Sequence, residues 1–349
     1  MAKIKLSRPA VWFCLMAAGI AALAGPEVGL AQHAAPLYGP VGVSPAAVKQ
    51  GRLGSCYFHA SVAAMASAMP DVLRQAIAAE PGGGYRVHFF DGRDELVYQE
   101  DLEYAAAHSF DHSEGAWVRV LMRAYAQRVL RASLHKSIET SSQIPVFVRP
   151  MALSALDQGG GVLMAYDRAI RMVVSQDGEI DKKALKVKLG EQGKALGIPA
   201  SITEMISGFL DEKGFFEGVE QTVRENGEFF GAYRSLSQGG IPAEVLRAFV
   251  GTAHERGVQD RARTLAQLRR LGQHDLAMTA ESGSPGSFDP GNWWVGGHAY
   301  TVLGYDEAAQ SVSLRNPWGG HPEPDGIFNL PVTVFLEAFD SYTASGEED

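Results

Sequence analysis

The chain has 349 residues, a formal net charge of −9 and 46% hydrophobic residues. This composition is typical of a globular protein with one large domain or two lobes. The acidic balance and the lack of a long basic cluster argue against nucleic-acid binding.

The N-terminus has the pattern of a targeting segment. Lys3, Lys5 and Arg8 precede the apolar run AVWFCLMAAGIAALAG, which suits a signal-peptide core and is short for a membrane span. We therefore predict a signal peptide over residues 1–31 and a secreted or periplasmic protein without membrane association after cleavage. An uncleaved membrane anchor is the alternative interpretation.

Cleavage after residue 31 would leave one cysteine, Cys56, because Cys14 lies in the removed segment. Exported proteins with disulfides keep an even number of cysteines, so a lone thiol needs another explanation. By default a lone cysteine is a small buried apolar residue. The alternative is that Cys56 is a nucleophile, and its neighbours decide between the two hypotheses.

The segment from Cys56 to Pro70 predicts a closely packed helix that begins at Cys56. It is rich in alanine, and one apolar stripe recurs at helical spacing: Phe58, Val62, Met65 and Met69. The N–H groups and dipole at the start of a helix would lower the pKa of the thiol. Gln50, just before the glycine turn, is placed to donate to an oxyanion together with the Cys56 backbone N–H. The alternative interpretation of Gln50 is an exposed loop residue without a catalytic role.

The segments HAYTVLGY and SVSLRNPW predict a hairpin around the polar turn DEAAQ. A hairpin centred on Glu307 gives these opposed pairs on one face: His298 with Asn316, Tyr300 with Leu314, and Val302 with Val312. An asparagine amide opposite His298 would hold one imidazole nitrogen and leave the other for the sulfur. Trp318 is predicted either to shield this bond from water or to pack in the core.

Three blocks, AVKQGRLGSCYFHA, GGHAYTVLGY and LRNPWGG, resemble the glutamine-and-cysteine, histidine and asparagine blocks of the calpain family of papain-like cysteine peptidases. Weaker similarities follow in the family's order: a strand pair in YRVHFFDGRDELVYQEDLE, a helix in WVRVLMRAYAQ and a closing segment in DGIFNLPVTVFLEAFDSY. The resemblance covers roughly residues 45–170 and 240–345.

The resemblance implies an α+β fold of the papain-like two-lobed type, with Cys56 on a helical lobe and His298 and Asn316 on a β-rich lobe. Cys56 would be the nucleophile and His298 the base. Asn316 would orient His298, and Gln50 would supply part of the oxyanion hole. The implied activity is that of a calpain-type thiol endopeptidase, a hydrolase that cleaves polypeptide substrates.

The implied catalytic domain covers residues 32–349, with an insertion near 176–229 that resembles nothing we can name. Catalytic cores of this family can bind calcium in their loops, but no calcium ligands can be matched here, so we assign no cofactor or metal. The oligomeric state does not follow from the sequence.

The chain departs from the calpain pattern at three positions near the nucleophile. Ser55 stands where calpains usually have Asp, and Tyr57 where they have Trp. His59 replaces an apolar residue, and we predict a packing role for it. Two other functions stay open, a transglutaminase-type acyl transferase and a non-catalytic binding module. Transglutaminases usually orient the histidine with Asp, and a decayed site commonly loses one of its key residues.

Three further motifs receive non-catalytic interpretations. His108 and His112 in HSFDH have the spacing of a metal pair, but we predict a solvated helix or loop there. The glycines of EPGGGYR predict a turn and not a phosphate loop. RARTLAQLRRLG predicts a basic amphipathic helix with a solvated face, in preference to a membrane or partner site.

Overall fold

The computed structural model describes residues 36–81, 83–140, 146, 149–158, 160–175, 179–198, 200, 203–204, 231–271, 276–283 and 293–346. The predicted signal peptide over 1–31 lies outside these residues. Across the described part of the chain, no helix has the length and apolar character needed to cross a bilayer. The chain divides into two compact units, one holding Leu156–Gly231 and the other holding Ala31–Ala155 with Ala232–Asp349.

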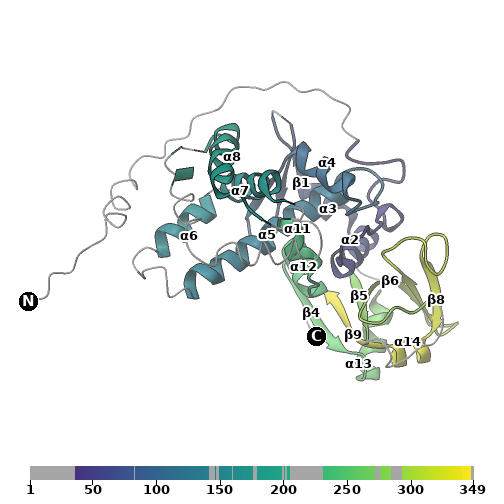
Figure 1. Cartoon of the computed structure of the whole chain (residues 1–349). Helices are drawn as coiled ribbons and strands as arrows, with labels where there is room; N and C mark the ends of the chain where they lie inside the picture. The colour runs from purple at the N-terminus through teal and green to yellow at the C-terminus, as the bar shows by residue number, and fades with distance from the viewer. Residues whose placement is uncertain are drawn as a thin grey trace, which may run out of the picture. The chain divides into compact units, whose positions relative to one another are not determined.

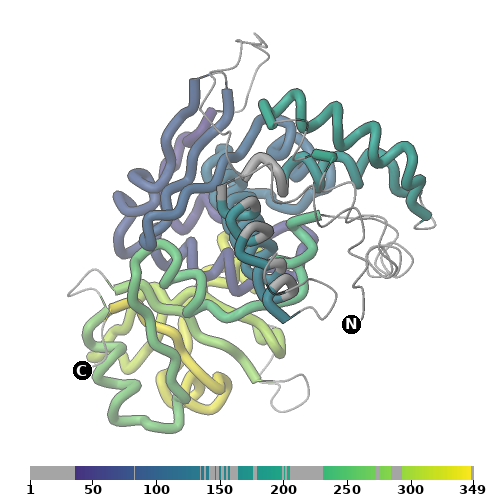
Figure 2. Tube along the Cα trace, turned by 90° about the vertical axis from the view of Figure 1, so that its left-hand side faces the viewer, coloured from purple at the N-terminus to yellow at the C-terminus, as the bar shows by residue number. Residues whose placement is uncertain are grey.

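The larger unit is an α+β structure with two antiparallel sheets (Figures 1 and 2). Its helices are η1 (Pro45–Ala47), α2 (Cys56–Ala68), α3 (Pro70–Gln75), α4 (Gln99–Ala107), α5 (Trp117–Thr140), α11 (Ala232–Ser237), α12 (Pro242–Val250), α13 (Arg261–Arg270) and α14 (Val332–Ala338). Its strands are β1 (Ile77–Ala79), β2 (Tyr85–His88), β3 (Asp94–Val97), β4 (Ala253–Gly257), β5 (Met278–Ser282), β6 (Ala299–Asp306), β7 (Ser311–Arg315), β8 (Ile327–Pro331) and β9 (Phe339–Ser345).

The α+β class expected from the sequence is confirmed. The strand pair predicted ahead of an acidic turn is present as β2 and β3, which pair antiparallel and lead into α4. The helix predicted from WVRVLMRAYAQ is the start of α5, and the basic helix is α13. The closing segment forms β8, α14 and β9 in succession.

The larger sheet has the strand order β4-β9-β5-β6-β7-β8, with every neighbouring pair antiparallel. The chain's last described strand, β9, therefore lies between β4 and β5. In Figure 1 these strands, coloured green to yellow, gather with α13 and α14. The purple α2 contacts β5 and β6, and α12 contacts β4 and β9.

The two faces of this sheet differ in chemistry because side chains alternate along a strand. One face carries a hydrophobic core that includes Met278, Tyr300, Val302, Leu314 and Tyr342. The opposite face carries buried polar residues: Thr279, Thr301, Arg315, Thr343 and Ser345. The Thr301 hydroxyl donates to the Ala60 carbonyl of α2 at 2.9 Å, so this polar face is bonded to the helix that begins at Cys56.

Helix α2 begins at Cys56 and ends at Ala68, as predicted, just before Pro70. Burial is not confined to one stripe: every residue from Tyr57 to Ala66 is buried, whereas Met69 is only partly so. A helix surrounded by α12, α3, β5 and β6 has no solvent face over most of its length. The small alanines let these neighbours approach from several sides at once.

The smaller unit contains α7 (Gly160–Val173) and α8 (Lys182–Ala195), which pack on each other; α6 (Arg149–Gln158) spans the unit boundary. Their shared core consists of Ala165, Ala169, Ile170, Leu185 and Leu189. The predicted insertion near 176–229 includes α8, but residues 205–230 lie outside the described part. Its status as an insertion stays a prediction.

Candidate active site

The predicted hairpin is present as β6 and β7, but its register differs from the prediction. Val302 pairs with Leu314 and not with Val312, and the register shifts between Val302 and Gly304. The turn occupies residues 307–310, so its centre lies beyond Glu307, and Asp306 pairs with Ser311, three residues further along than predicted. The shift between Val302 and Gly304 then reduces this offset to two residues. A slip of two residues keeps the faces of a strand unchanged, so His298 and Asn316 become diagonal neighbours on one face instead of directly opposed.

His298 and Asn316 form the hydrogen bond that the sequence predicts. His298 lies just before β6 and Asn316 just after β7, and Nε2 of the imidazole is 3.1 Å from Oδ1 of the amide. The Trp318 backbone N–H donates to the same Oδ1 at 3.0 Å, which fixes the amide with its oxygen toward both partners. Nε2 must then carry a proton, so in the neutral imidazole Nδ1 is the basic nitrogen.

The backbone at His298 is held by β5. The His298 N–H donates to the Ser282 hydroxyl at 3.0 Å, and the Ser282 N–H donates to the His298 carbonyl at 2.9 Å. Gly297, with a φ of 64°, has a left-handed conformation that favours glycine. These contacts leave the imidazole, which is 6% exposed, little freedom to turn away from Asn316.

Trp318 lies against His298 with ring centroids 4.9 Å apart. The indole is 42% exposed, so it covers the imidazole from the solvent side. Core packing, one of the two predicted roles, is therefore wrong for this residue. The position fits the other role, in which the ring keeps water from the bond between His298 and Asn316.

Gln50 is buried, so the alternative of an exposed loop glutamine is wrong. Its backbone N–H donates to the Pro317 carbonyl at 2.8 Å, which places it beside the Asn316 end of the hairpin. Its Nε2 donates to the Leu53 carbonyl at 2.6 Å and retains a second N–H for another acceptor. The next residue, Gly51, has to be glycine, because a Cβ at that position would collide with the Ser109 carbonyl.

Cys56 is the first residue of α2 and is partly buried. Burial raises the pKa of its thiol, and the N–H groups of Ala299, Tyr57 and Cys56 itself offset only part of that effect. The predicted lowering of this pKa is therefore wrong, because desolvation outweighs the N–H groups at the helix start. The contact with Ala299 places the sulfur beside the residue that follows His298.

The pKa of the His298 imidazole changes in the opposite direction to that of the Cys56 thiol. Burial lowers its pKa from 6.5 to about 4, and His321 lowers it further, although the bond to Asn316 raises it. Near neutral pH the site therefore holds a neutral thiol and a neutral imidazole. Within the described residues no hydrogen bond joins Cys56 to His298, which leaves Nδ1 without a hydrogen-bond partner there.

Glu281 is a residue near the site that the sequence interpretation missed. It pairs with Ala299 in the sheet, and its charge raises the pKa of the Cys56 thiol. Burial raises its own pKa to about 7, while hydrogen bonds from Ser341 and Thr279 lower it. An acidic residue within the otherwise small and apolar segment LAMTAES, shortly before the histidine block, was the available signal.

Arg315 is a second missed residue. It is fully buried next to Asn316, and its Nη2 donates to the Val48 carbonyl at 2.6 Å. Desolvation lowers the pKa of its guanidinium to about 10. The bond connects the hairpin residue before Asn316 to the loop two residues before Gln50, so it fixes the spacing of the two.

The predicted solvated character of HSFDH is wrong for Asp111. This carboxylate is buried and lies 3.2 Å from Nε2 of His59, and it also accepts from Ser113 and Arg119. His59 therefore has a packing role, as the sequence predicts, and it packs through a polar contact with Asp111. Across the described ranges, no group of three or more His, Cys, Asp and Glu side chains has an arrangement that suits a metal ion.

Comparisons with known proteins add little to this geometry. No family model matches the chain, and no curated protein matches it. The chain has a weak similarity to a solved structure, the crystal structure of PepW from Lactobacillus rhamnosis HN001, at 10% sequence identity and a TM-score of 0.30. That match covers 86% of this chain and 80% of the other, and at this TM-score it supports no argument about fold or function.

Proposed function

We propose that the protein is a thiol endopeptidase of papain-like fold, with Cys56 as nucleophile and His298 as base. Asn316 orients the imidazole, and Gln50 supplies an oxyanion donor. The observation that carries the proposal is the buried bond from His298 to Asn316, with the Cys56 sulfur against the N–H of Ala299. The resemblance to the calpain family and the predicted export of the chain support the same function.

The reaction begins with proton transfer, because the thiol and the imidazole are both neutral near pH 7. Nδ1 of His298 takes the proton from Sγ of Cys56 as the sulfur attacks the peptide carbonyl carbon. The carbonyl oxygen becomes an oxyanion and accepts hydrogen bonds from the Cys56 backbone N–H and from Gln50. Each partner is charged only while the other is, so neither charge is buried alone.

The protonated His298 then gives its proton to the leaving amine, and the carbon–nitrogen bond breaks to leave a thioester on Cys56. Water attacks the thioester with His298 as base, which releases the acid and restores the thiol. Asn316 accepts from Nε2 throughout, so the ring keeps Nδ1 toward the sulfur. Trp318 excludes water from that bond.

The experiment is peptide profiling of the purified protein beside Cys56→Ala, with and without added calcium and an added primary amine. Cleavage with release of free carboxyl and amine termini, absent from Cys56→Ala, is the expected result. Incorporation of the added amine instead of hydrolysis would identify an acyl transferase. Equal products from both proteins, or binding of peptide without turnover, would overturn the peptidase proposal.

A further inference from the structure

Glu281 lies on the polar face of the larger sheet, beside the proposed nucleophile. It pairs with Ala299 of β6 on one side and with Ser341 of β9 on the other. The Cys56 sulfur lies against the N–H of the same Ala299. Opposed residues of antiparallel strands have Cα atoms about 4.5–5.5 Å apart, so Glu281 is only one strand away from the residue that the sulfur contacts.

Helix α2 packs on this same polar face, and its first turn is at the level of Glu281. The Thr301 hydroxyl donates to the Ala60 carbonyl, one turn into the helix. Two residues back along β6 is Ala299, and one turn back along α2 is Cys56. These steps are both about 5–7 Å long, so Cys56 and Ala299 are again side by side. The pairing of Ala299 with Glu281 then brings the carboxylate to the same level.

The end of the polar face that holds Glu281 is open to solvent. Glu281 and Ser341 are partly exposed, and Gly257, which pairs with Ser341, is exposed. One row further along the sheet, Thr279 and Thr343 are buried. A ligand can therefore approach the row of Glu281 from the solvent side, whereas the next row is covered.

The Glu281 carboxylate has hydrogen-bond donors around it but no countercharge. Its Oε1 accepts from the Thr279 hydroxyl at 2.8 Å, and its Oε2 accepts from the Ser341 hydroxyl at 2.7 Å. The Thr343 hydroxyl also lowers its pKa. A carboxylate has about four acceptor sites, so at least one remains for a further donor. Within the described residues, Glu281 forms no ion pair.

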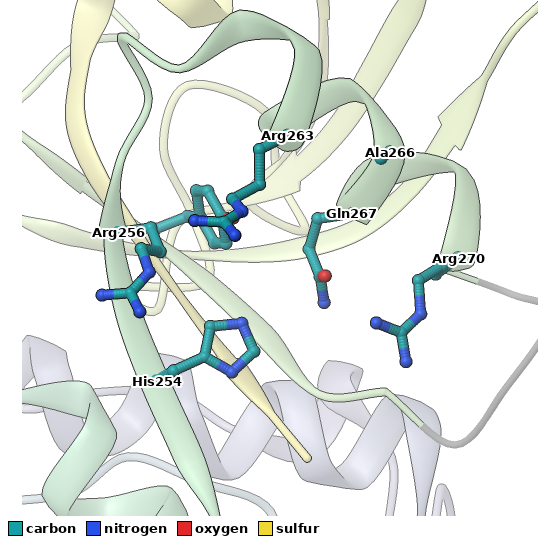
Figure 3. A pocket seen from close by; sticks show the side chains of 7 residues that line it. His254, Arg256, Arg263, Ala266, Gln267 and Arg270 are labelled. Carbon is teal, nitrogen blue, oxygen red and sulfur yellow. The ribbon is translucent and has the colours of Figure 1, made fainter. Parts of the chain in front are cut away.

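The basic side chains that the structure describes on neighbouring elements lie elsewhere. Figure 3 shows those of β4 and α13 around one pocket, and the same pocket is lined by Tyr342, which belongs to the apolar core. Arg247 of α12 donates to the carbonyl of Ala253, the first residue of β4. Glu281 is level with Gly257, the last residue of β4, because both pair with the same residue of β9. These cations therefore do not neutralise Glu281.

A second carboxylate adds negative charge to the polar face. Glu255 and Thr279 both pair with Thr343, so Glu255 is on this face, and it is exposed. Its charge raises the pKa of Glu281, although burial is the main cause of the rise to about 7. A cation beside Glu281 would favour the ionised carboxylate against both effects. The site is therefore suited to a positively charged ligand.

We propose that Glu281 is a specificity-determining residue that binds a lysine or arginine side chain of the polypeptide substrate, within two residues of the scissile bond. The proposal rests on the peptidase function proposed for Cys56. An extended peptide advances about 3.3 Å per residue, so only residues close to the scissile bond are near enough to reach one strand across the sheet. An ammonium or guanidinium both donates to the carboxylate and compensates its charge, whereas a neutral donor cannot compensate it.

The test compares peptides that differ only in arginine or citrulline, placed in turn at the two residues on either side of the scissile bond. Citrulline has nearly the size of arginine but no charge. At one position, kcat/KM of the native protein should be at least about tenfold higher for the arginine peptide. Glu281→Gln should reduce this ratio to below about twofold and keep kcat/KM for the citrulline peptide within about threefold of native.

Two further variants separate recognition from a structural role of Glu281. Glu337→Gln is the matched control, because it removes the same charge from an exposed position of α14 and should leave the ratio unchanged. Glu281→Asp keeps the charge and should retain part of the preference for arginine. If Glu281 only joined β5 to β9 through Ser341, Glu281→Gln would lower kcat/KM for both peptides equally, and that result would overturn the proposal.

The native protein alone distinguishes a failure of this proposal from a failure of the proposed function. Cleavage with equal kcat/KM for arginine and citrulline at all four positions overturns the role of Glu281 and leaves the peptidase function in place. No cleavage of any peptide overturns both. This comparison needs no variant, so it decides the point even where Glu281→Gln does not fold. A preference for arginine that Glu281→Gln keeps in full would also overturn the proposal.

Discussion

Two buried histidines of the same unit, His298 and His59, differ in what holds them. His59 has both ring nitrogens bonded, Nδ1 to the Ser55 carbonyl at 3.0 Å and Nε2 to the Asp111 carboxylate at 3.2 Å. His298 bonds through Nε2 to the neutral amide of Asn316, and its Nδ1 is directed to no described hydrogen bond. The comparison teaches that burial does not decide whether a histidine can act as a base. What decides it is whether one ring nitrogen is left without a hydrogen bond.

The partner also sets the charge that each site tolerates. Asp111 sits in a polar network with Ser113 and Arg119, so its charge is compensated. Asn316 brings no charge, and desolvation therefore lowers the pKa of His298 to about 4. A neutral partner keeps His298 able to accept a proton over the whole neutral range, which a general base requires.

The largest effect should come from replacing each histidine by alanine. His298→Ala is expected to reduce kcat/KM by about 10⁴-fold or more while the protein stays folded, because it removes the base itself. His59→Ala should destabilise the fold by roughly 2–3 kcal/mol, since it leaves the buried Asp111 carboxylate without one donor. Peptide hydrolysis and urea unfolding of both variants check this. The comparison fails if His59→Ala removes activity from a fold of native stability.

Gln50→Ala should have the next largest effect, a decrease in kcat of about 10²–10³-fold with little change in KM. The physical reason is the loss of one donor to an oxyanion that forms only during the reaction. Gln75→Ala, at an exposed end of α3, is the control and should leave kcat unchanged. An unchanged kcat in Gln50→Ala would remove Gln50 from the oxyanion hole.

Asn316→Asp gives His298 the kind of partner that His59 has. The native acid limb of kcat/KM is expected near pH 4, because protonation of Nδ1 below that pH removes the base. A carboxylate at residue 316 favours the imidazolium, so this limb should move upward by about 1–3 pH units. At pH 5 the variant should then be at least several times slower than the native protein.

The matched control for this shift is Asp111→Asn, which alters the partner of His59 and should leave the acid limb where it is. Asn316→Ala should retain measurable activity, because Asn316 orients the base and makes or breaks no bond. Glu281 also titrates near the site, but it is the same in every variant compared. If the acid limb of kcat/KM does not move in Asn316→Asp, then protonation of His298 is not the cause of that limb.

The sequence predicts the parts of the site that depend on local chemistry. The start of α2, the turn near Glu307, and the pairing of His298 with Asn316 on one face all follow from helical and strand periodicity. The register was wrong because the turn occupies residues 307–310 and is therefore not centred on Glu307; the bulge between Val302 and Gly304 reduces the resulting offset from three residues to two. The two-residue slip preserved the faces, and so the predicted bond formed despite the error.

What the sequence does not predict depends on distant segments. Asp111 becomes a buried partner of His59 because its strand-like segment pairs with the loop at Gln50. Glu281 approaches Cys56 through the pairing of β5 with β6. The direction of the thiol pKa likewise depends on how much of the chain covers Cys56, whereas the helix N-terminus that predicted the opposite is a local feature.

The smallest effect should come from the cover over His298. Trp318→Ala removes an indole that is 42% exposed and lies 4.9 Å from the imidazole, but it keeps the backbone N–H that orients Asn316. Water then reaches the imidazole, and since desolvation is the main cause of its low pKa, the acid limb should rise by less than about one pH unit. At pH 7 kcat/KM should fall by less than about tenfold, while Trp318→Phe should stay close to native. The pH–rate profiles of the two variants decide the point. A shift as large as that of Asn316→Asp would mean that Trp318 orients the base and does not merely cover it, and no shift at all would mean that it does neither.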